Sequence, residues 1–227
     1  MHIPALTPTV RRPLRTPAAW LLAGAAALLL GACGSLPDKP QRATLYDFGP
    51  GGLQVNAAAA PAAQRPAITL PEVEVAGRLD GTQLLYRLGY ADAQVLHAYG
   101  QARWSQPPAQ LLRQRLRDSL AQQRTVLNPD EAAGIARSEG RVPDVLRLSL
   151  DEFSHYFQSP GQSAGLLRLR ATLLRNGAGG DRVVAQRSFT VQRPAPTADA
   201  AGGVKALTAA SDAAIAEVAQ WVAQQDR

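Results

Sequence analysis

The stretch VLRLSLDEF, residues 145–153, decides how this chain folds, because leucine occupies every second position over its first half. This alternation is typical of a β-strand with one apolar and one polar face. Two later stretches have a similar alternation of apolar and polar residues: GLLRLRATLLR at 165–175 and RVVAQRSFTV at 182–191. Turn-forming residues at 159–161 and 176–181 separate the three stretches. We therefore expect three neighbouring antiparallel strands.

Shorter strand patterns precede these three. The segment ITLPEVEV, 68–75, alternates valine with glutamate after Pro71. QLLYRLGY, 83–90, and QVLHAYG, 94–100, alternate on either side of a short turn, which favours an antiparallel hairpin. Large apolar residues also alternate at 45–48, where we expect a short edge strand at most.

Two segments have helical periodicity. Leucines recur every fourth position at 112, 116 and 120, after Ser105 as a candidate cap and two prolines that a first helical turn tolerates. The tail, 203–224, repeats apolar residues every three or four positions. The order of strands, helix, strands and helix predicts an α+β fold, with a mostly antiparallel sheet and two helices packed on one face.

The N-terminal residues predict export. Arginines at 11, 12 and 15 precede an apolar run of about 13 residues, from about Ala18 to Leu30, and no acidic residue interrupts them. A membrane-spanning helix needs roughly 20 apolar residues, so a cleaved secretory signal fits better than a retained anchor helix. The predicted domains are a signal peptide at 1–32, an anchor and an Ala/Pro/Gly-rich tether at 33–66, and one folded domain at 67–227.

Cys33 is the only cysteine and directly follows the apolar run. Leu30-Gly31-Ala32-Cys33 resembles the bacterial lipobox, in which the cysteine thiol forms a thioether to a diacylglyceryl group and the chain is cut before the cysteine. The alternative is an inert cysteine in an ordinary signal. Two or more acyl chains anchor a protein stably to a membrane. Because Gly34, and not aspartate, follows Cys33, the resemblance implies the periplasmic face of the outer membrane.

Charge excludes one class of partner. The formal net charge is +6 at pH 7, and loss of residues 1–32 with their three arginines would lower it to +3. Nucleic-acid binding needs a dense basic face. We therefore expect no nucleic-acid partner.

Several segments together carry a resemblance to a family: LYDFGP at 45–50, LLYR at 84–87, HAYGQARWSQPPAQLL at 97–112, the strand at 145–153 and AIAEVAQWV at 214–222. With the lipobox, they resemble the ABC-type transport auxiliary lipoproteins, the group of PqiC-like intermembrane transport lipoproteins.

The resemblance implies an outer-membrane subunit that docks a periplasmic conduit protein of the mammalian-cell-entry (MCE) type, which works in lipid transport with an ABC permease and ATPase. A homo-oligomeric ring is compatible with this role. The alternative is a stand-alone periplasmic lipoprotein that binds a lipid or small ligand.

No pattern indicates catalysis, a metal or a cofactor. His97 and His155 are far apart and lack neighbouring cysteines, and no serine has the glycine-flanked turn of a nucleophile. We therefore expect that the protein is not an enzyme.

The candidate partner-binding residues are aromatic or lie beside an aromatic: Arg103, Trp104, Tyr156 and Phe157. For Trp104 and for the pair Tyr156 and Phe157, packing inside the domain is the alternative.

Overall fold

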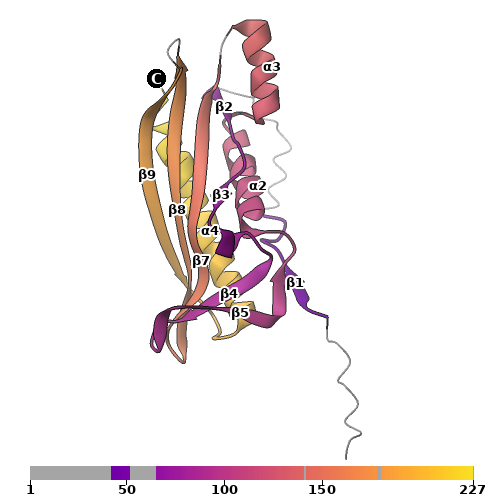
Figure 1. Cartoon of the computed structure of the whole chain (residues 1–227), viewed down its shortest axis with the longest axis vertical. Coiled ribbons are helices and arrows are strands. Elements are labelled where there is room, and N and C mark those ends of the chain that lie inside the picture. The colour runs from indigo at the N-terminus through magenta and orange to yellow at the C-terminus, as the bar shows by residue number, and fades with distance from the viewer. Residues whose placement is uncertain (1–41, 52–64, 141, 178–179, 227) are drawn as a thin grey trace, which may run out of the picture. The chain divides into compact units, whose positions relative to one another are not determined.

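A computed structural model describes residues 42–51, 65–140, 142–177 and 180–226 (Figure 1). Within these residues nine strands form one sheet, accompanied by three α-helices and a 3-10 turn at Gly77–Leu79. The fold is α+β, as the sequence predicts. Arg42–Arg227 forms one compact unit.

Three long strands make up the body of the sheet. β7 (Asp144–Ser159) pairs antiparallel with β8 (Gln162–Gly177), which pairs antiparallel with β9 (Gly180–Pro194). The prediction of three neighbouring antiparallel strands is confirmed here. Each strand extends beyond its alternating pattern. In β7, a register shift between Leu150 and Glu152 changes which parity of residue faces the core, so that Phe153 and Phe157 are buried after it.

The other edge of β7 is shared by three short strands. β2 (Arg65–Thr69), β3 (Glu74–Val75) and β4 (Gln83–Leu88) all pair with β7 in parallel.

Beyond these strands, β6 (Arg124–Leu127) pairs in parallel with β2, β5 (Asp92–Trp104) pairs antiparallel with β4, and β1 (Thr44–Tyr46) pairs in parallel with β5. The sheet is therefore mixed, and the prediction of a mostly antiparallel sheet is wrong. The chain passes through two helices between β5 and β7, and such a crossover lets strands run in the same direction.

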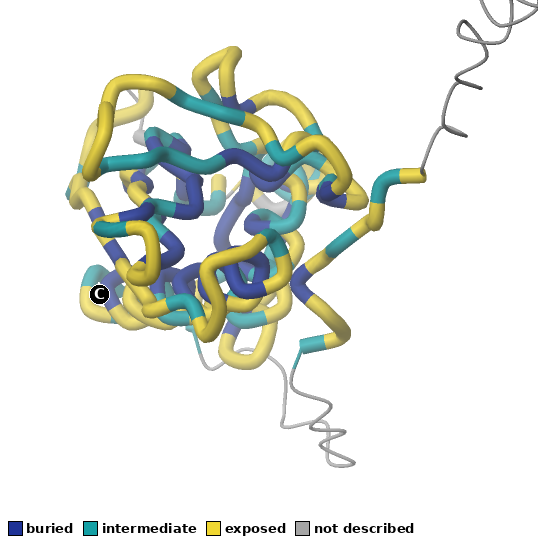
Figure 2. Tube along the Cα trace, turned by 90° about the horizontal axis from the view of Figure 1, so that it is seen from below, coloured by how far each residue is buried: buried dark blue, intermediate teal, exposed yellow. Residues whose placement is uncertain are grey.

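Two helices cover one face of the sheet. α2 (Pro108–Ala121) and α4 (Ala200–Ala223) correspond to the two predicted helices, and their buried faces join one hydrophobic core. Figure 2 shows the buried positions gathered in the interior of the domain and the exposed ones around it. The backbone of α4 approaches the sheet closely, since a Cβ atom on Gly165 would overlap the backbone of Ala206, and one on Gly203 would overlap the His155 ring.

A third helix was not expected. α3 (Pro129–Glu139) lies near the start of β2, beyond the end of α2 in Figure 1. Asn128 caps it in a capping box with Glu131. Its sequence, PDEAAGIARSE, is rich in small residues and has one large apolar side chain, so it gives no helical stripe. The prediction of two helices is corrected to three among the described residues.

The compact unit also begins earlier than the predicted boundary at residue 67. β1 and the start of β2 pair with other strands of the sheet, and Phe48 is buried in the core. The sequence between residues 49 and 66 is rich in Gly, Ala and Pro, and the strand before it is short. For this reason the sequence pattern did not indicate that the compact unit begins before residue 67.

Candidate functional site

The segment that follows β1 is fixed in a definite conformation. The Asp47 carboxylate accepts a hydrogen bond from the Gly49 amide at 2.7 Å, and Gly49 has a φ of 68° that favours glycine. Phe48 points inward, where its ring meets Trp104 edge-on at 5.6 Å and lies 6.2 Å from Phe153. The chain therefore enters the domain through a buried aromatic contact.

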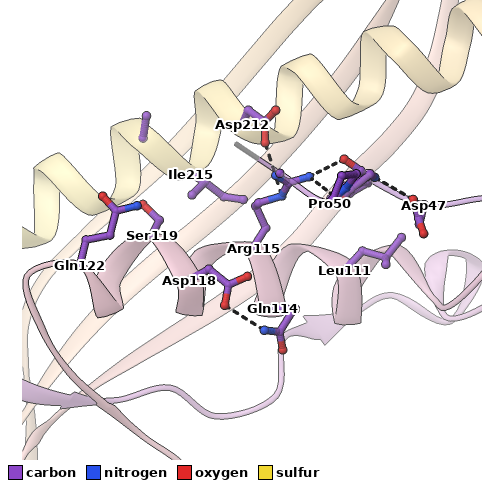
Figure 3. Close-up of a pocket in the computed structure, with 14 residues that line it drawn as sticks. Asp47, Pro50, Leu111, Gln114, Arg115, Asp118, Ser119, Gln122, Asp212 and Ile215 are labelled. Atoms are coloured by element: carbon purple, nitrogen blue, oxygen red, sulfur yellow. Dashed lines mark hydrogen bonds and ion pairs between the residues drawn. The ribbon is translucent and has the colours of Figure 1, made fainter. Parts of the chain in front are cut away.

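Arg115 of α2 connects this segment to both helices (Figure 3). Its guanidinium donates to the carbonyl oxygens of Phe48 and Gly49 and lies 3.6 Å from the carboxylate of Asp212 on α4. A Cβ atom on Gly51 would overlap the Arg115 guanidinium, so glycine makes room for this contact. Cation-assisted hydrogen bonds of this kind are stronger than neutral ones.

Between the segment and the two helices lies a cleft of about 540 Å³, which we call the anchor-side cleft. Its three carboxylates already have partners: Asp47 accepts from the Gly49 amide, Asp118 accepts from Gln114 at 2.9 Å, and Asp212 faces Arg115. No pair resembles a nucleophile beside a base. The arrangement holds the entering chain against α2 and α4, which is a mechanical role.

The structure places Arg103 and Trp104 at the end of β5. Trp104 is 1% exposed and packs between Phe48 and Phe153. This is the core position that the sequence left as the alternative to a partner contact. Arg103 is half-buried and donates to the carbonyl of Tyr99 at 3.2 Å.

Tyr156 and Phe157 lie where β7 pairs with β4, next to the β4–β5 hairpin. Phe157 is buried, 4.4 Å from the ring of His155 and 6.1 Å from that of Tyr86. Tyr156 is half-buried over Gly89, where a Cβ atom would overlap its ring. This part of the chain packs against its neighbours and does not form an exposed aromatic tip. A partner-binding role for the four candidate residues remains a prediction.

His155 forms a buried polar network that the sequence did not reveal. It is fully buried, with Nδ1 2.9 Å from the Tyr99 hydroxyl and Nε2 2.7 Å from Ser163 Oγ. Burial lowers the pKa of His155 to about 4, against an opposing effect of Asp199. Burial also raises the pKa of Tyr99 above its ordinary value. Both ring nitrogens of this buried imidazole are therefore within hydrogen-bonding distance of a side-chain hydroxyl, which connects β7 to β5 and β8.

Among the described residues, no group of three or more His, Cys, Asp and Glu side chains is arranged to hold a metal. None of the helices in the described ranges is long and apolar enough to cross a bilayer. Cys33 and the predicted signal peptide lie outside the described residues.

Comparison with known families identifies the chain. The model of the ABC-type transport auxiliary lipoprotein component matches residues 52–219, about three quarters of the sequence. The chain belongs to this family. The family resemblance seen in the sequence is thereby confirmed, and the protein is a lipoprotein component of a transport system. No curated protein matches the auxiliary lipoprotein in sequence.

Two solved structures share the fold of the auxiliary lipoprotein. One is protein XCC0632 from Xanthomonas campestris, of the DUF330 family, with 21% identity, a TM-score of 0.61, and coverage of 72% of this chain and 87% of the other. The second is an uncharacterized protein with 17% identity and a TM-score of 0.55, covering 80% of this chain and 99% of the other. At these identities the likeness concerns the fold.

Proposed function

We propose that the auxiliary lipoprotein is anchored to the outer membrane through Cys33 and docks the periplasmic conduit of an MCE-type ABC lipid transport system. In this role it catalyses no reaction and needs no cofactor. The conduit protein is the direct partner, the permease and ATPase are indirect partners, and several copies form a ring.

The family match supports the transport role, and the pairing of β1 with β5 soon after Cys33 supports a mechanical connection between the anchor and the folded domain. Thr44, the first residue of β1, lies eleven positions after Cys33. A fully extended chain spans at most about 3.6 Å per residue, so the lipid would hold the start of β1 within about 40 Å of the bilayer. A force applied through the lipid anchor would act first on β1, Phe48 and Arg115. These residues connect the anchored segment to the sheet and to both helices.

The anchor is tested by replacing its thiol. Cells that express the wild type or Cys33→Ser are labelled with radioactive palmitate, and their inner and outer membranes are separated on a sucrose gradient. We expect label and protein in the outer-membrane fraction for the wild type, and neither for the variant. Equal labelling of Cys33→Ser would refute this attachment site.

The docking role is tested by capture of a defined partner. The lipidated protein is solubilised in detergent and used to capture the MCE protein encoded nearest to it, and light scattering of the same sample gives its subunit number. Recovery of that MCE protein supports docking. Recovery of bound lipid or another small molecule without it would favour a stand-alone binding lipoprotein, for which the anchor-side cleft of about 540 Å³ is large enough.

A further inference from the structure

A second cavity of about 540 Å³ lies at the α3 end of the sheet, which we call the α3 cavity. Its apolar walls come from the β2–β3 connection, from α3 and from the start of β7: Pro71, Pro129, Ala132, Ala133, Val142 and Val145. Val142 is 48% exposed. A cavity of this size and lining suits an apolar group of a ligand.

Thr69 is one of the residues that line this cavity. Thr69 is 3% exposed, and its Oγ1 has no hydrogen-bond partner among the described residues. Buried polar groups are nearly always paired, and an unpaired one is costly. A ligand that supplies a donor or an acceptor here would remove that cost.

The rim of the α3 cavity is predominantly acidic. Among the described residues that line the cavity, Glu72, Glu74 and Asp181 contribute carboxylates and Arg147 contributes a guanidinium. The Glu72 carboxylate is already paired with Arg113, so Glu74 and Asp181 are the carboxylates left to face a ligand. Glu74, Asp181 and Arg147 are exposed. This charge balance favours a cation near the opening and opposes the phosphate of an anionic lipid.

Arg113 of α2 fixes the two walls of the cavity relative to each other. It donates to the carbonyl oxygens of Leu70 and Pro71, at 3.0 Å each, and to Asn128 Oδ1 at 2.9 Å. It also lies 3.3 Å from the Glu72 carboxylate. Asn128 is the residue that caps α3, so one side chain connects the β2–β3 wall to the α3 wall. A site held open in this way costs little to organise on binding.

The α3 cavity lies far from the anchored end of the domain. Val145 pairs with Thr69 beside the cavity, whereas His155, ten residues further along β7, pairs with Tyr86 of β4. At roughly 3.3 Å per residue this separation is about 33 Å. The cavity is therefore at the opposite end of β7 from the β4–β5–β1 part of the sheet that receives the anchor.

We propose that the α3 cavity binds a chain segment of a partner protein in which an aliphatic side chain is followed by a lysine or arginine. The aliphatic group fills the apolar cavity, a backbone amide pairs with Thr69, and the cation faces Glu74 and Asp181. This deepens the proposed function, on which it rests for the identity of the partner as the conduit protein.

The test uses the lipidated full chain in detergent micelles and a defined probe. The probe is the acetylated, amidated hexapeptide Gly-Ser-Leu-Val-Lys-Gly, and its control has glutamate in place of lysine. Titrations are followed by the backbone amide signals of Ala132, Ala133 and Val145. We expect saturable shifts with the lysine peptide and at least tenfold weaker binding of the glutamate peptide at low salt.

Matched variants separate binding from folding. Thr69→Val should weaken binding of the lysine peptide about three- to tenfold, which is the effect of one hydrogen bond. The variant without peptide should unfold at the same temperature as the wild type or at a higher one. Thr190→Val, the same change on an exposed position of β9, should leave the affinity unchanged. Glu74→Gln should weaken binding about two- to fivefold at low salt and not at 0.5 M salt, whereas Glu217→Gln on α4 should have no effect.

Three outcomes would overturn the inference: no saturable shift, equal binding of the two peptides, or the same shifts produced by phosphatidylglycerol vesicles. None of them involves the capture of the MCE protein. A chain that captures the conduit and ignores the lysine peptide would therefore overturn the site in the α3 cavity and leave the proposed function in place.

Discussion

The two ends of β7 are stabilised by different chemistry. At the β4–β5 end, which we call the aromatic end, the rings of Phe48, Trp104 and Phe153 pack together beside the neutral His155 network. At the other end, the arginine end, guanidinium groups connect strands and helices through carbonyl oxygens and carboxylates, and the α3 cavity lies at the same end.

The difference teaches where this fold is rigid and where it can accommodate a ligand. Buried aromatic packing leaves no space and depends on shape. Arginine side chains are long, so their hydrogen bonds can connect two walls of a cavity without bringing the walls into contact. The ring cluster next to the entering chain is thus closely packed, and the anchor-side cleft lies outside it, whereas at the other end of β7 arginine contacts connect the walls next to the α3 cavity. The predictions below test this contrast.

The largest effect is expected from Trp104→Ala at the aromatic end. Removal of a fully buried indole that contacts Phe48 and Phe153 should lower the free energy of unfolding by about 3–5 kcal/mol, because the rings around it cannot fill the space. Urea denaturation followed by circular dichroism measures this. Leu45→Ala, at a residue 68% exposed, is the control and should change stability by under about 0.5 kcal/mol. A loss below about 1 kcal/mol for Trp104→Ala would contradict the closed aromatic core.

Acid should weaken the same end. The pKa of His155 is lowered to about 4 in the folded protein, whereas an unfolded histidine titrates near 6.5. Between these values the unfolded state binds the extra proton, so stability falls as the pH falls from about 6.5 to 4, by about 3 kcal/mol in total. Denaturation at several pH values measures the slope. His155→Gln should remove most of it, and an unchanged slope in that variant would assign the effect to another group.

At the arginine end, Asp226→Asn should cost about 1–3 kcal/mol. Asp226 accepts hydrogen bonds from Arg124 at 2.6 Å and 3.0 Å and from Arg65 at 2.8 Å, and Arg124 is 4% exposed. The variant leaves that buried guanidinium without a carboxylate.

Asp212→Asn, at a more exposed carboxylate 3.6 Å from Arg115, is the matched control and should lose under about 0.5 kcal/mol. Thermal unfolding compares the two, and equal losses would show that burial of the ion pair is unimportant. Although burial acts to raise the pKa of Asp226, the hydrogen bonds from Arg124 and Arg65 lower it overall. Its contribution is therefore lost only at more acidic pH than that of His155.

The smallest effect is expected on the outer face of the sheet, midway between the ends. Arg170→Ala removes an exposed ion pair with Asp151 at 3.1 Å and should change the free energy of unfolding by under about 0.5 kcal/mol. The same denaturation assay applies. A loss above about 1 kcal/mol would mean that arginine pairs matter on the open surface as well as around the cavity.

Local patterns in the sequence predicted the parts of this fold that depend on local order. Alternating leucines located β7 and β8, and the periodicity of the tail located α4, because burial of one face repeats with the period of the element. The direction of strand pairing could not be read in this way. Leu146 and Leu148 would alternate equally in a parallel or an antiparallel sheet, so the parallel partners of β7 were missed.

The candidate site was harder to predict because its contacts join residues far apart in the chain. Arg124 and Asp226 are 102 positions apart, and Arg115 meets the Phe48 carbonyl from 67 positions away. No spacing rule marks such pairs. Trp104 was recognised as important from its position before the helix, but only the packing of three rings shows that it faces the core.

The arrangement of partners along β7 also governs the order of events when the chain is made. β4 can pair with β5, and β2 with β6, before β7 is made, but their other edges pair only with β7, Ile68 with Asp144 and Tyr86 with His155. β8 and β9 follow β7 directly. Contacts between distant segments slow folding. The first 140 or so residues that leave the ribosome therefore contain strand edges that have no partner until β7 is made. The earlier strands complete their pairing on β7, which belongs to the antiparallel β7–β8–β9 segment in the last third of the chain.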